Sequence, residues 1–472
     1  MHWLAHHLSL ILFFVLAIAL FCGFPVAFVL GGIAILFGGL GILLDVFQPV
    51  QFFNLLPRVW GSAASNPILV AVPMFIFMGT ILERSGVAND LLHCLQVLLR
   101  RVPGGLAMSV TLMGTIMAAT TGIVGASVVM LTLIALPTMM ERGYSKEMAV
   151  GTIASAGTLG ILIPPSIMLV IMGDLLSVSV GALFAAAVVP GLLLSLLYLV
   201  YLGGLSFLKP ELEPPLTRHN GPVPRVRATG LQRRSAAEVL AMRGERWLPP
   251  TFLIVMVLGS IFGGWATPTE AAGVGVAGAL ILALFNRRLD MKTLKETIES
   301  SALTNAMVFF IVFGATLFSF VFRALGGDDL VVEVLKAAGL DTGWEILTFL
   351  MVLVFVLGFF FDWIEICLIV LPVFAPVLQG LDFSAHVGAG GPILFLTWFV
   401  IMMSVNLQTS FLTPPFGFTL FYMKGTVPPS INMGHIYRGI IPFVVLQMLA
   451  LLLVIAFPQL ALWLPRSVGF LE

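Results

Sequence analysis

Long apolar stretches without a charged side chain dominate the pattern of the chain. Three of them run for 37 residues (8–44), 38 residues (103–140) and 34 residues (175–208). The hydrocarbon core of a bilayer is about 30 Å thick, so about 20 apolar residues in a helix cross it. Each stretch is long enough for at least one crossing, and the pattern predicts an all-α polytopic membrane protein.

The longest polar interruption runs from 209 to 246 and separates two apolar halves of similar length. It carries eight Lys and Arg against four Asp and Glu, and by the positive-inside tendency we expect it in the cytoplasm. The expected organisation is a first repeat over 1–208, a basic polar linker over 209–247 and a second repeat over 248–472.

The two halves contain similar short motifs in the same order. From the second proline of each Pro-Pro pair to the proline of the last motif, the offsets are 25 and 27 residues. Membrane transporters with such internal similarity are commonly built from two repeats of inverted topology, and this is the arrangement we expect. The matched segments are 62–66 with 301–305, 73–79 with 309–314, 160–166 with 410–417, and 188–192 with 440–444.

Each Pro-Pro pair predicts a broken helix, near 157–166 in the first half and near 406–417 in the second. Proline lacks the backbone donor and disfavours helix in the preceding residue, so we expect the chain to be unwound over 160–166 and 410–417. Broken backbone is tolerated at membrane depth only where it faces protein or a watery cavity. Carbonyl oxygens and half-helix amino termini at these breaks are therefore candidate ligands.

Asn66 and Asn305 mark the other repeated polar cluster, and we expect re-entrant hairpin tips near 62–67 and 301–306. The uncharged run 59–82 has 24 residues, enough for one crossing or for a hairpin to mid-membrane and back, and Asn66-Pro67 favours the hairpin. The tips are expected to approach the midplane from opposite sides. For any single Ser, Thr or Asn the alternative is a hydrogen bond between helices.

Two tips and two breaks that meet at the midplane suit a cation and an anion together. Their oxygen atoms fit a hard cation such as sodium, and positive half-helix ends fit a carboxylate. The constellation predicts cation-coupled uptake of an organic acid. Asp362, an acid within an apolar region, is a further coupling candidate, with a proton relay or a structural contact as alternatives. Glu270, after Pro268, is expected only to begin a helix.

Composition and motifs exclude several classes of protein. The chain is 59% hydrophobic and 10% charged, with a mean hydropathy of +1.09, and its 23 basic residues equal its 23 acidic ones. No basic face points to nucleic acid, no Gly-Lys pair supports a P-loop, and no HExxH motif is present. The three cysteines lie far apart and predict no disulfide. The first basic residue is Arg58, so we expect the first span to be retained rather than cleaved. We predict no enzyme and no cofactor other than a coupling ion.

Several segments resemble the large membrane subunit of tripartite ATP-independent periplasmic (TRAP) transporters, over nearly the whole chain. The resemblance rests on segments 23–28, 142–144, 160–166 and 406–417, and segments 413–425 and 436–442 resemble the branch labelled mannitol/chloroaromatic type.

This resemblance implies a multi-pass protein of the bacterial inner membrane that works by an elevator mechanism, with a transport domain sliding against a scaffold. It implies sodium-driven uptake of an organic acid, a small membrane subunit and a periplasmic solute-binding protein as partners. By position, the implied sodium ligands are Ser65, Asn66, Gly157, Thr158, Gly160, Thr304, Asn305, Thr409 and Thr413. The implied solute contacts are Pro164, Pro165, Ser166, Pro414 and Pro415.

Two other functions fit the same sequence. A stand-alone divalent-anion/sodium symporter would share hairpins and Pro-Pro breaks but would need no binding protein. A membrane scaffold protein without transport activity would show no sodium dependence.

Overall fold

The computed structural model describes residues 7–99, 102–121, 124–209, 251–414 and 417–471. Within these ranges the chain is mostly helical and contains no strand, and seven helices are long and apolar enough to cross a membrane. The all-α polytopic fold expected from the apolar stretches is confirmed. The seven are α3 (Val26–Leu43), α9 (Val124–Glu141), α12 (Val180–Leu208), α14 (Pro268–Phe285), α15 (Met291–Ala324), α20 (Gly391–Leu412) and α22 (Met433–Ala456).

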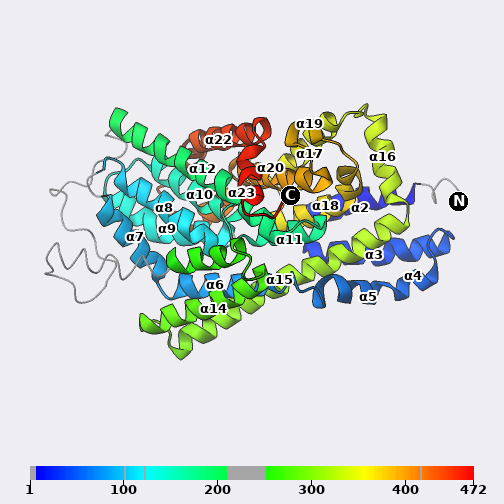
Figure 1. Cartoon of the computed structure of the whole chain (residues 1–472), viewed down its shortest axis with the longest axis horizontal. Coiled ribbons are helices and arrows are strands. Elements are labelled where there is room, and N and C mark those ends of the chain that lie inside the picture. Colours follow the sequence, from blue (N-terminus) through cyan, green and yellow to red (C-terminus); the bar gives the residue numbers. More distant parts are fainter. Residues whose placement is uncertain (1–6, 100–101, 122–123, 210–250, 415–416, 472) are drawn as a thin grey trace.

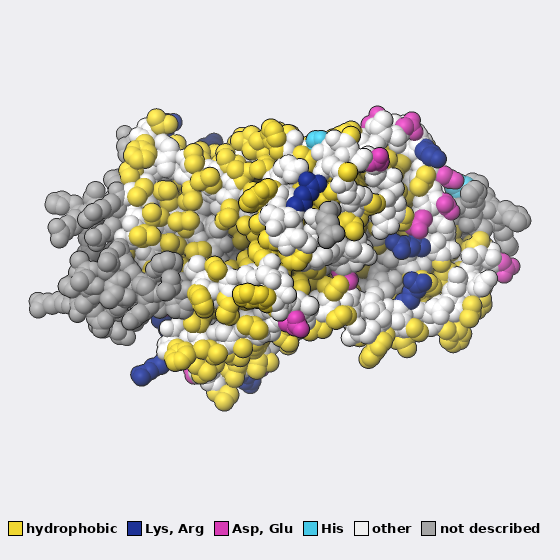
Figure 2. Space-filling model, in the orientation of Figure 1, with side chains coloured by type: hydrophobic (Ala, Val, Ile, Leu, Met, Phe, Trp, Pro, Cys, Tyr) yellow, Lys and Arg dark blue, Asp and Glu magenta, His cyan; other side chains and the backbone are white. Residues whose placement is uncertain are grey.

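Hydrophobic side chains are dense over the left and middle of the face seen in Figure 2. Shorter helices lie among the seven spans. They are α2 (Leu8–Phe21), α4 (Pro49–Phe53), α5 (Leu55–Val59), η1 (Trp60–Ala64), α6 (Ala71–Arg84), α7 (Val87–Leu98), α8 (Gly105–Thr121), α10 (Lys146–Thr158), η2 (Leu159–Ile161), α11 (Ile167–Leu176), an unlabelled helix (Thr251–Phe262), α16 (Gly327–Ala337), α17 (Gly343–Leu357), α18 (Trp363–Gln379), α19 (Ser384–Val387), α21 (Phe418–Thr426) and α23 (Gln459–Ser467).

One long arm runs obliquely through the molecule. We define it as residues 55–84 together with α15, which packs against α5, η1 and α6 and also against α3. α15 has 34 residues and begins at Asp290, whose Oδ1 accepts a 2.7 Å hydrogen bond from the Thr293 amide. Hydrogen bonds from Thr293 hold the pKa of the Asp290 carboxyl below its usual value. The arm is a long pair of packed helical segments that lies beside the remaining helices (Figure 1).

Two hairpins, α8–α9 and α17–α18, enter the molecule from opposite ends. The hairpin α8–α9 ends near the start of α22. Lys146, which begins α10 just after this hairpin, donates to the Ser430 carbonyl just before α22 at 2.8 Å. The end of the second lies near the end of α22, where the His386 Nε2 is 2.7 Å from the Ile455 carbonyl. In Figure 1 α8 and α9 lie at the left, and α16 and α19 at the right. This opposed entry agrees with the expected inverted repeats.

The hairpin tips lie elsewhere than the asparagine clusters suggested. The predicted tip near 301–306 is wrong, because α15 is continuous through Asn305. No proline follows Asn305 to remove a helical donor, and the Asn305 amide donates to the Ser301 carbonyl one turn earlier at 2.8 Å. The helix therefore has no reason to end there.

The segment near 62–67 is a break but not a hairpin. The chain passes from η1 to α6 in the same direction across the molecule (Figure 1), and α15 packs against both. The Asn66 side chain explains the geometry, because its Oδ1 accepts from the Ile68 amide at 3.0 Å. This short local turn bypasses Pro67 without reversing the chain.

Two helices are interrupted at the proline pairs. α10 ends at Thr158 and α11 begins at Ile167, with η2 between them, so Gly160 is in a helical turn and the unwound part is 162–166. α20 continues to Leu412 before α21 begins at Phe418. Ser410 is therefore helical, and the second unwound part is shorter than the 410–417 expected. The predicted linker 209–247 lies outside the described residues from 210 onward.

Candidate functional site

Polar side chains at the first helix break donate hydrogen bonds to nearby backbone carbonyls. The Ser166 hydroxyl donates to the Ile161 carbonyl at 2.7 Å, and the Thr158 hydroxyl donates to the Ser155 carbonyl at 2.9 Å. Both side chains are fully buried, as are Pro164 and Pro165. The Ser166 bond satisfies the Ile161 carbonyl, which Pro165 leaves without its helical donor.

A hairpin rests directly on this first break. A Cβ atom at Gly157 would lie 3.1 Å from the Cα and 3.2 Å from the backbone nitrogen of Val128 on α9. Only glycine permits so close an approach of α10 to α9. The hairpin α8–α9 is thereby fixed to the place where α10 ends.

The second break is held in a similar way. The Thr413 hydroxyl donates to the Thr409 carbonyl at 2.8 Å, and the Thr409 hydroxyl donates to the Val405 carbonyl at 2.8 Å. The Gly417 amide donates back to the Thr413 carbonyl at 3.2 Å. Pro414 lies in the turn between these bonds, and Pro415, a predicted solute contact, lies outside the described residues.

The two broken helices meet in the interior. The Gln408 Nε2 of α20 donates to the Thr158 hydroxyl of α10 at 3.4 Å. Gln408 is fully buried, and its Oε1 has no hydrogen-bond partner within the described part of the chain. An oxygen left without a partner at such depth costs free energy, so this junction has a free acceptor on the side chain that donates to Thr158.

The second hairpin rests on the second break. A Cβ atom at Gly358, at the end of α17, would collide with the Ser410 hydroxyl. The turn 358–362 then leads into α18, where the Asp362 Oδ1 accepts from the Trp363 amide at 2.7 Å and the Glu365 Oε2 accepts from the Asp362 amide at 3.3 Å. These two acids form a capping box that begins α18 at the hairpin tip. Glu270 begins α14 in the same manner, as expected.

A cavity of about 690 Å³ lies where both hairpins approach α21. A Cβ atom at Gly125 of α9 would lie within 3.1 Å of three ring carbons of Tyr422, so the first hairpin contacts α21 directly. Aromatic rings provide most of the wall, and Thr426 is a polar residue among them. The lining consists of Val129, Phe359, Phe360, Phe418, Phe421, Tyr422, Gly425 and Thr426.

The predicted site residues fall into separate groups. Thr158, Gly157 and Gly160 lie at the first break, and Thr409 and Thr413 lie at the second, where the sequence placed them. The buried Pro164, Pro165 and Ser166 do not line the aromatic cavity.

The asparagine clusters have other partners than the breaks. The Asn66 Nδ2 donates to Asp174 Oδ1 on α11 at 2.6 Å, and the Ser65 hydroxyl donates to the Trp60 carbonyl at 3.2 Å within η1. Thr304 lines a cavity of about 370 Å³ between α6, α9 and α15. No hydrogen bond described here joins Asn66 to Gly157 or Asn305 to Thr409.

Sequence reasoning missed Gln408 and the two true hairpin tips. Gln408 was visible as an amide within an uncharged membrane span, and polar side chains at membrane depth are a functional signal. The tip at 358–362 had a signal too, because Asp362 and Glu365 have the spacing of a capping box.

Comparison with known proteins gives one family. Residues 11–460 match the family described as tripartite ATP-independent periplasmic transporter, DctM component. A C4-dicarboxylate TRAP transporter large permease of Pseudomonas aeruginosa is 31% identical over 92% of this chain and 93% of its own. An ectoine TRAP transporter large permease of Halomonas elongata is 29% identical over 96% and 97%.

Two further similarities add a fused relative and a fold. An isethionate TRAP transporter permease named DctMQ, from Oleidesulfovibrio alaskensis, is 29% identical over 96% of this chain and 66% of its own length. Among solved structures, the Alcanivorax borkumensis YdaH transporter superposes with a TM-score of 0.57 over 90% of each chain, at 14% identity. At that identity the superposition shows a shared fold alone.

Proposed function

Since the chain belongs to the DctM-component family of tripartite ATP-independent periplasmic transporters, we propose that it takes up a small organic acid by sodium symport. It is a multi-pass transport permease of the bacterial inner membrane and not an enzyme. Members of this family work with a small membrane subunit and a periplasmic binding protein. For this chain we propose both partners as separate proteins.

The observation that carries the sodium proposal is the junction of the two breaks. The Gln408 Oε1 has no hydrogen-bond partner among the described residues, and the Nε2 of the same side chain donates to the Thr158 hydroxyl. Thr409 is the next residue of α20. Amide, hydroxyl and backbone carbonyl oxygens are ligands for a hard cation, and broken helices provide such carbonyls in transporters. A bound sodium ion would provide the missing partner for the Gln408 oxygen.

The proposed solute site is the aromatic cavity at the start of α21. Both hairpins contribute to its wall, so closing or opening either hairpin changes access to it. α21 begins at this cavity, directly after the second break, and a helix amino terminus attracts an anion. The names of three relatives mention C4-dicarboxylate, ectoine and isethionate, so a small organic acid is the solute class we propose here.

The movement we propose is a sliding of the breaks and hairpins along the arm. The hairpins are fixed to the breaks through Gly157 and Gly358, which makes them one unit. Two hydrogen bonds among the described residues join the arm to this unit, Asn66 to Asp174 at 2.6 Å and Arg323 to the Pro372 carbonyl at 2.9 Å.

Reconstitution tests the tripartite proposal against the stand-alone symporter. Proteoliposomes would contain the chain alone, the chain with its small membrane subunit, or both with the loaded binding protein outside. Uptake that needs all three components supports the proposal. Equal uptake by the chain alone would favour the symporter, and no uptake under any sodium gradient would favour a scaffold protein.

A further inference from the structure

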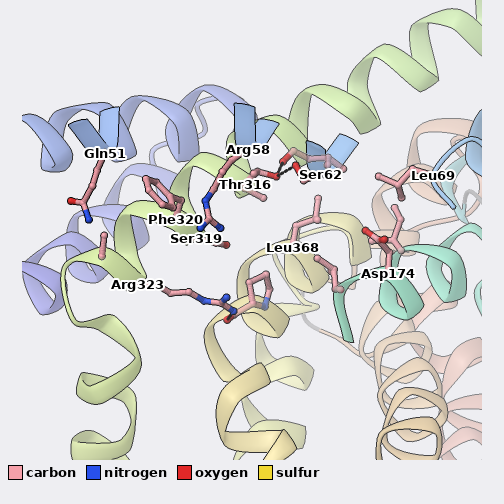
Figure 3. Close-up of a pocket in the computed structure, with 16 residues that line it drawn as sticks. Gln51, Arg58, Ser62, Leu69, Asp174, Thr316, Ser319, Phe320, Arg323 and Leu368 are labelled. Carbon is pink, nitrogen blue, oxygen red and sulfur yellow. Dashed lines mark hydrogen bonds between the residues drawn. The ribbon is translucent and has the colours of Figure 1, made fainter. Parts of the chain in front are cut away.

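A second cavity, of about 580 Å³, separates the arm from α11 and α18. We call it the arginine cavity, because Arg58 from α5 and Arg323 from the end of α15 both line it. Figure 3 shows the Arg58 side chain pointing from α5 into this space, with Arg323 below it. Asp174 lies at the other end of the cavity and accepts the amide of Asn66.

Only one of the two guanidinium groups, that of Arg323, has an acidic partner among the described residues. Arg58 stacks on the Phe320 ring, with its Cζ 4.6 Å from the ring centroid, and in the described part of the chain it makes no ion pair. Arg323 donates to the Pro372 carbonyl at 2.9 Å, and its Nε is 3.7 Å from Asp328 Oδ1. The near end of the cavity therefore carries an excess of positive charge.

Hydroxyl groups complete the lining at this end. The Ser62 Oγ of η1 and the Thr316 Oγ1 of α15 share a hydrogen bond of 3.0 Å. The buried Ser319 hydroxyl has no hydrogen-bond partner among the described residues. Ser319 lies next to the end of the Arg58 side chain in Figure 3. Guanidinium and hydroxyl donors around one space are the chemistry that binds carboxylate or phosphate oxygens.

The cavity lies toward the face on which α12 begins, and the basic segment 209–246 follows the other end of α12 in the chain. α12 has 29 residues, which span about 43 Å, and it ends at Leu208 just before that segment. Its start at Val180 is therefore on the opposite face, and the last turn of α11, with Asp174 and Leu175, lies beside that start. With the basic segment in the cytoplasm, the arginine cavity belongs to the periplasmic half.

We propose that the arginine cavity is an anion-binding vestibule, which receives the carboxylate of the solute from the periplasm before it reaches the site between the hairpins. This inference rests on the proposed function. A lipid phosphate offers the same oxyanion chemistry, and the experiment distinguishes the two sources. Positive charge in a low-dielectric cleft raises the local concentration of an anion by about tenfold or more.

Thiol labelling measures the charge of the cavity without knowledge of the solute. Ser319→Cys is introduced into the full chain carrying Cys22→Ser, Cys94→Ser and Cys367→Ala, in nanodiscs of phosphatidylcholine. The probes are an anionic sulfonatoethyl and a cationic trimethylammonioethyl methanethiosulfonate. Ser177→Cys, an exposed position on the same face and outside the cavity, provides the reference ratio of the two rates.

We expect the anionic reagent to be favoured in the Ser319→Cys variant by about tenfold over the reference ratio. Arg58→Gln or Arg323→Gln should each reduce this preference, and Arg58→Lys should keep it, which separates charge from misfolding. Equal rates of the two reagents at the thiol introduced in the cavity, or a preference unchanged in both Gln variants, would overturn the proposal.

A lipid arm of the same experiment identifies the source of the anion. With phosphatidylglycerol added to the nanodiscs, an unchanged preference supports a vestibule that is free for solute. Loss of the preference would mean that a lipid phosphate occupies the cavity, and would overturn the vestibule. Because labelling needs no uptake, failure here leaves the proposed sodium symport untouched, and failure of uptake leaves this result standing.

Discussion

Asn66 Nδ2 donates a 2.6 Å hydrogen bond to Asp174 Oδ1, which joins the break in the arm to the last turn of α11. α11 directly follows the first proline pair, so this bond connects the arm to the unit that we propose to move. A hydrogen bond to a charged group contributes about 1.5–3 kcal/mol. The bond is strong enough to hold one position of that unit relative to the arm.

Removal of this bond should release the two parts. We expect Asn66→Ala to change the rate of thiol labelling at Ser62→Cys, in the cavity between them, by about tenfold, because about 1.5 kcal/mol is lost from one of two positions. Ser65→Ala is the matched control, since that hydroxyl bonds only within its own helix. An unchanged labelling rate in Asn66→Ala would mean that the bond does not hold the position.

Sodium affinity should depend on hydroxyls at the breaks and not on hydroxyls elsewhere in the same helix. We expect Thr409→Val to raise the sodium concentration for half-maximal uptake by about tenfold, because one oxygen near a charged partner is lost. Thr397→Val is the control, since Thr397 is equally buried in α20 and bonds only to the Ile393 carbonyl. Equal sodium dependence of both variants would remove Thr409 from the site.

Close packing of the first hairpin on the first break should be sensitive to a single methyl group. In Gly157→Ala the added Cβ approaches the Val128 backbone, and overpacking of this kind costs about 1–3 kcal/mol. We expect a lower melting temperature and loss of uptake. Gly204→Ala, on α12 with open space around it, should leave the melting temperature the same or higher. Equal melting temperatures for wild type and Gly157→Ala would show that α9 does not rest on this glycine.

Filling the aromatic cavity should block solute without affecting sodium. Val129→Trp places a large ring in the cavity between the hairpins and α21. We expect uptake to stop while stabilisation of the purified chain by sodium persists. Leu133→Trp, one turn further along α9 and 61% exposed, should transport normally. Normal uptake by Val129→Trp would place the solute elsewhere.

Proline was a reliable guide to the site, and asparagine was not. The rings of Pro164 and Pro414 have a direct effect on the backbone, so their helices break nearby. Asn305 exerts no such effect and is accommodated in a continuous helix by a bond to Ser301. The two similar polar clusters therefore lie on the two helical segments that form the arm, residues 55–84 and α15, and not at hairpin tips.

The partner of each polar group could not be read from the chain. Asn66 and Asp174 are 108 positions apart and Gln408 and Thr158 are 250 apart. Both contacts depend on how the helices pack, and the apolar faces of these helices do not specify which helices become neighbours. The tip at 358–362 was predictable locally, from the capping pair Asp362 and Glu365, because a helix beginning within an apolar stretch implies a turn before it.

The most direct test of the account is accumulation of solute under an imposed sodium gradient. Proteoliposomes containing this chain and its small membrane subunit, with the loaded binding protein outside, would receive equal inward gradients of sodium or potassium chloride and the same imposed membrane potential of about 100 mV, negative inside. One net charge moved across 100 mV supplies about 2.3 kcal/mol, enough for about 50-fold accumulation. The account predicts accumulation of that order with sodium and none with potassium. Equal accumulation in both salts would contradict it.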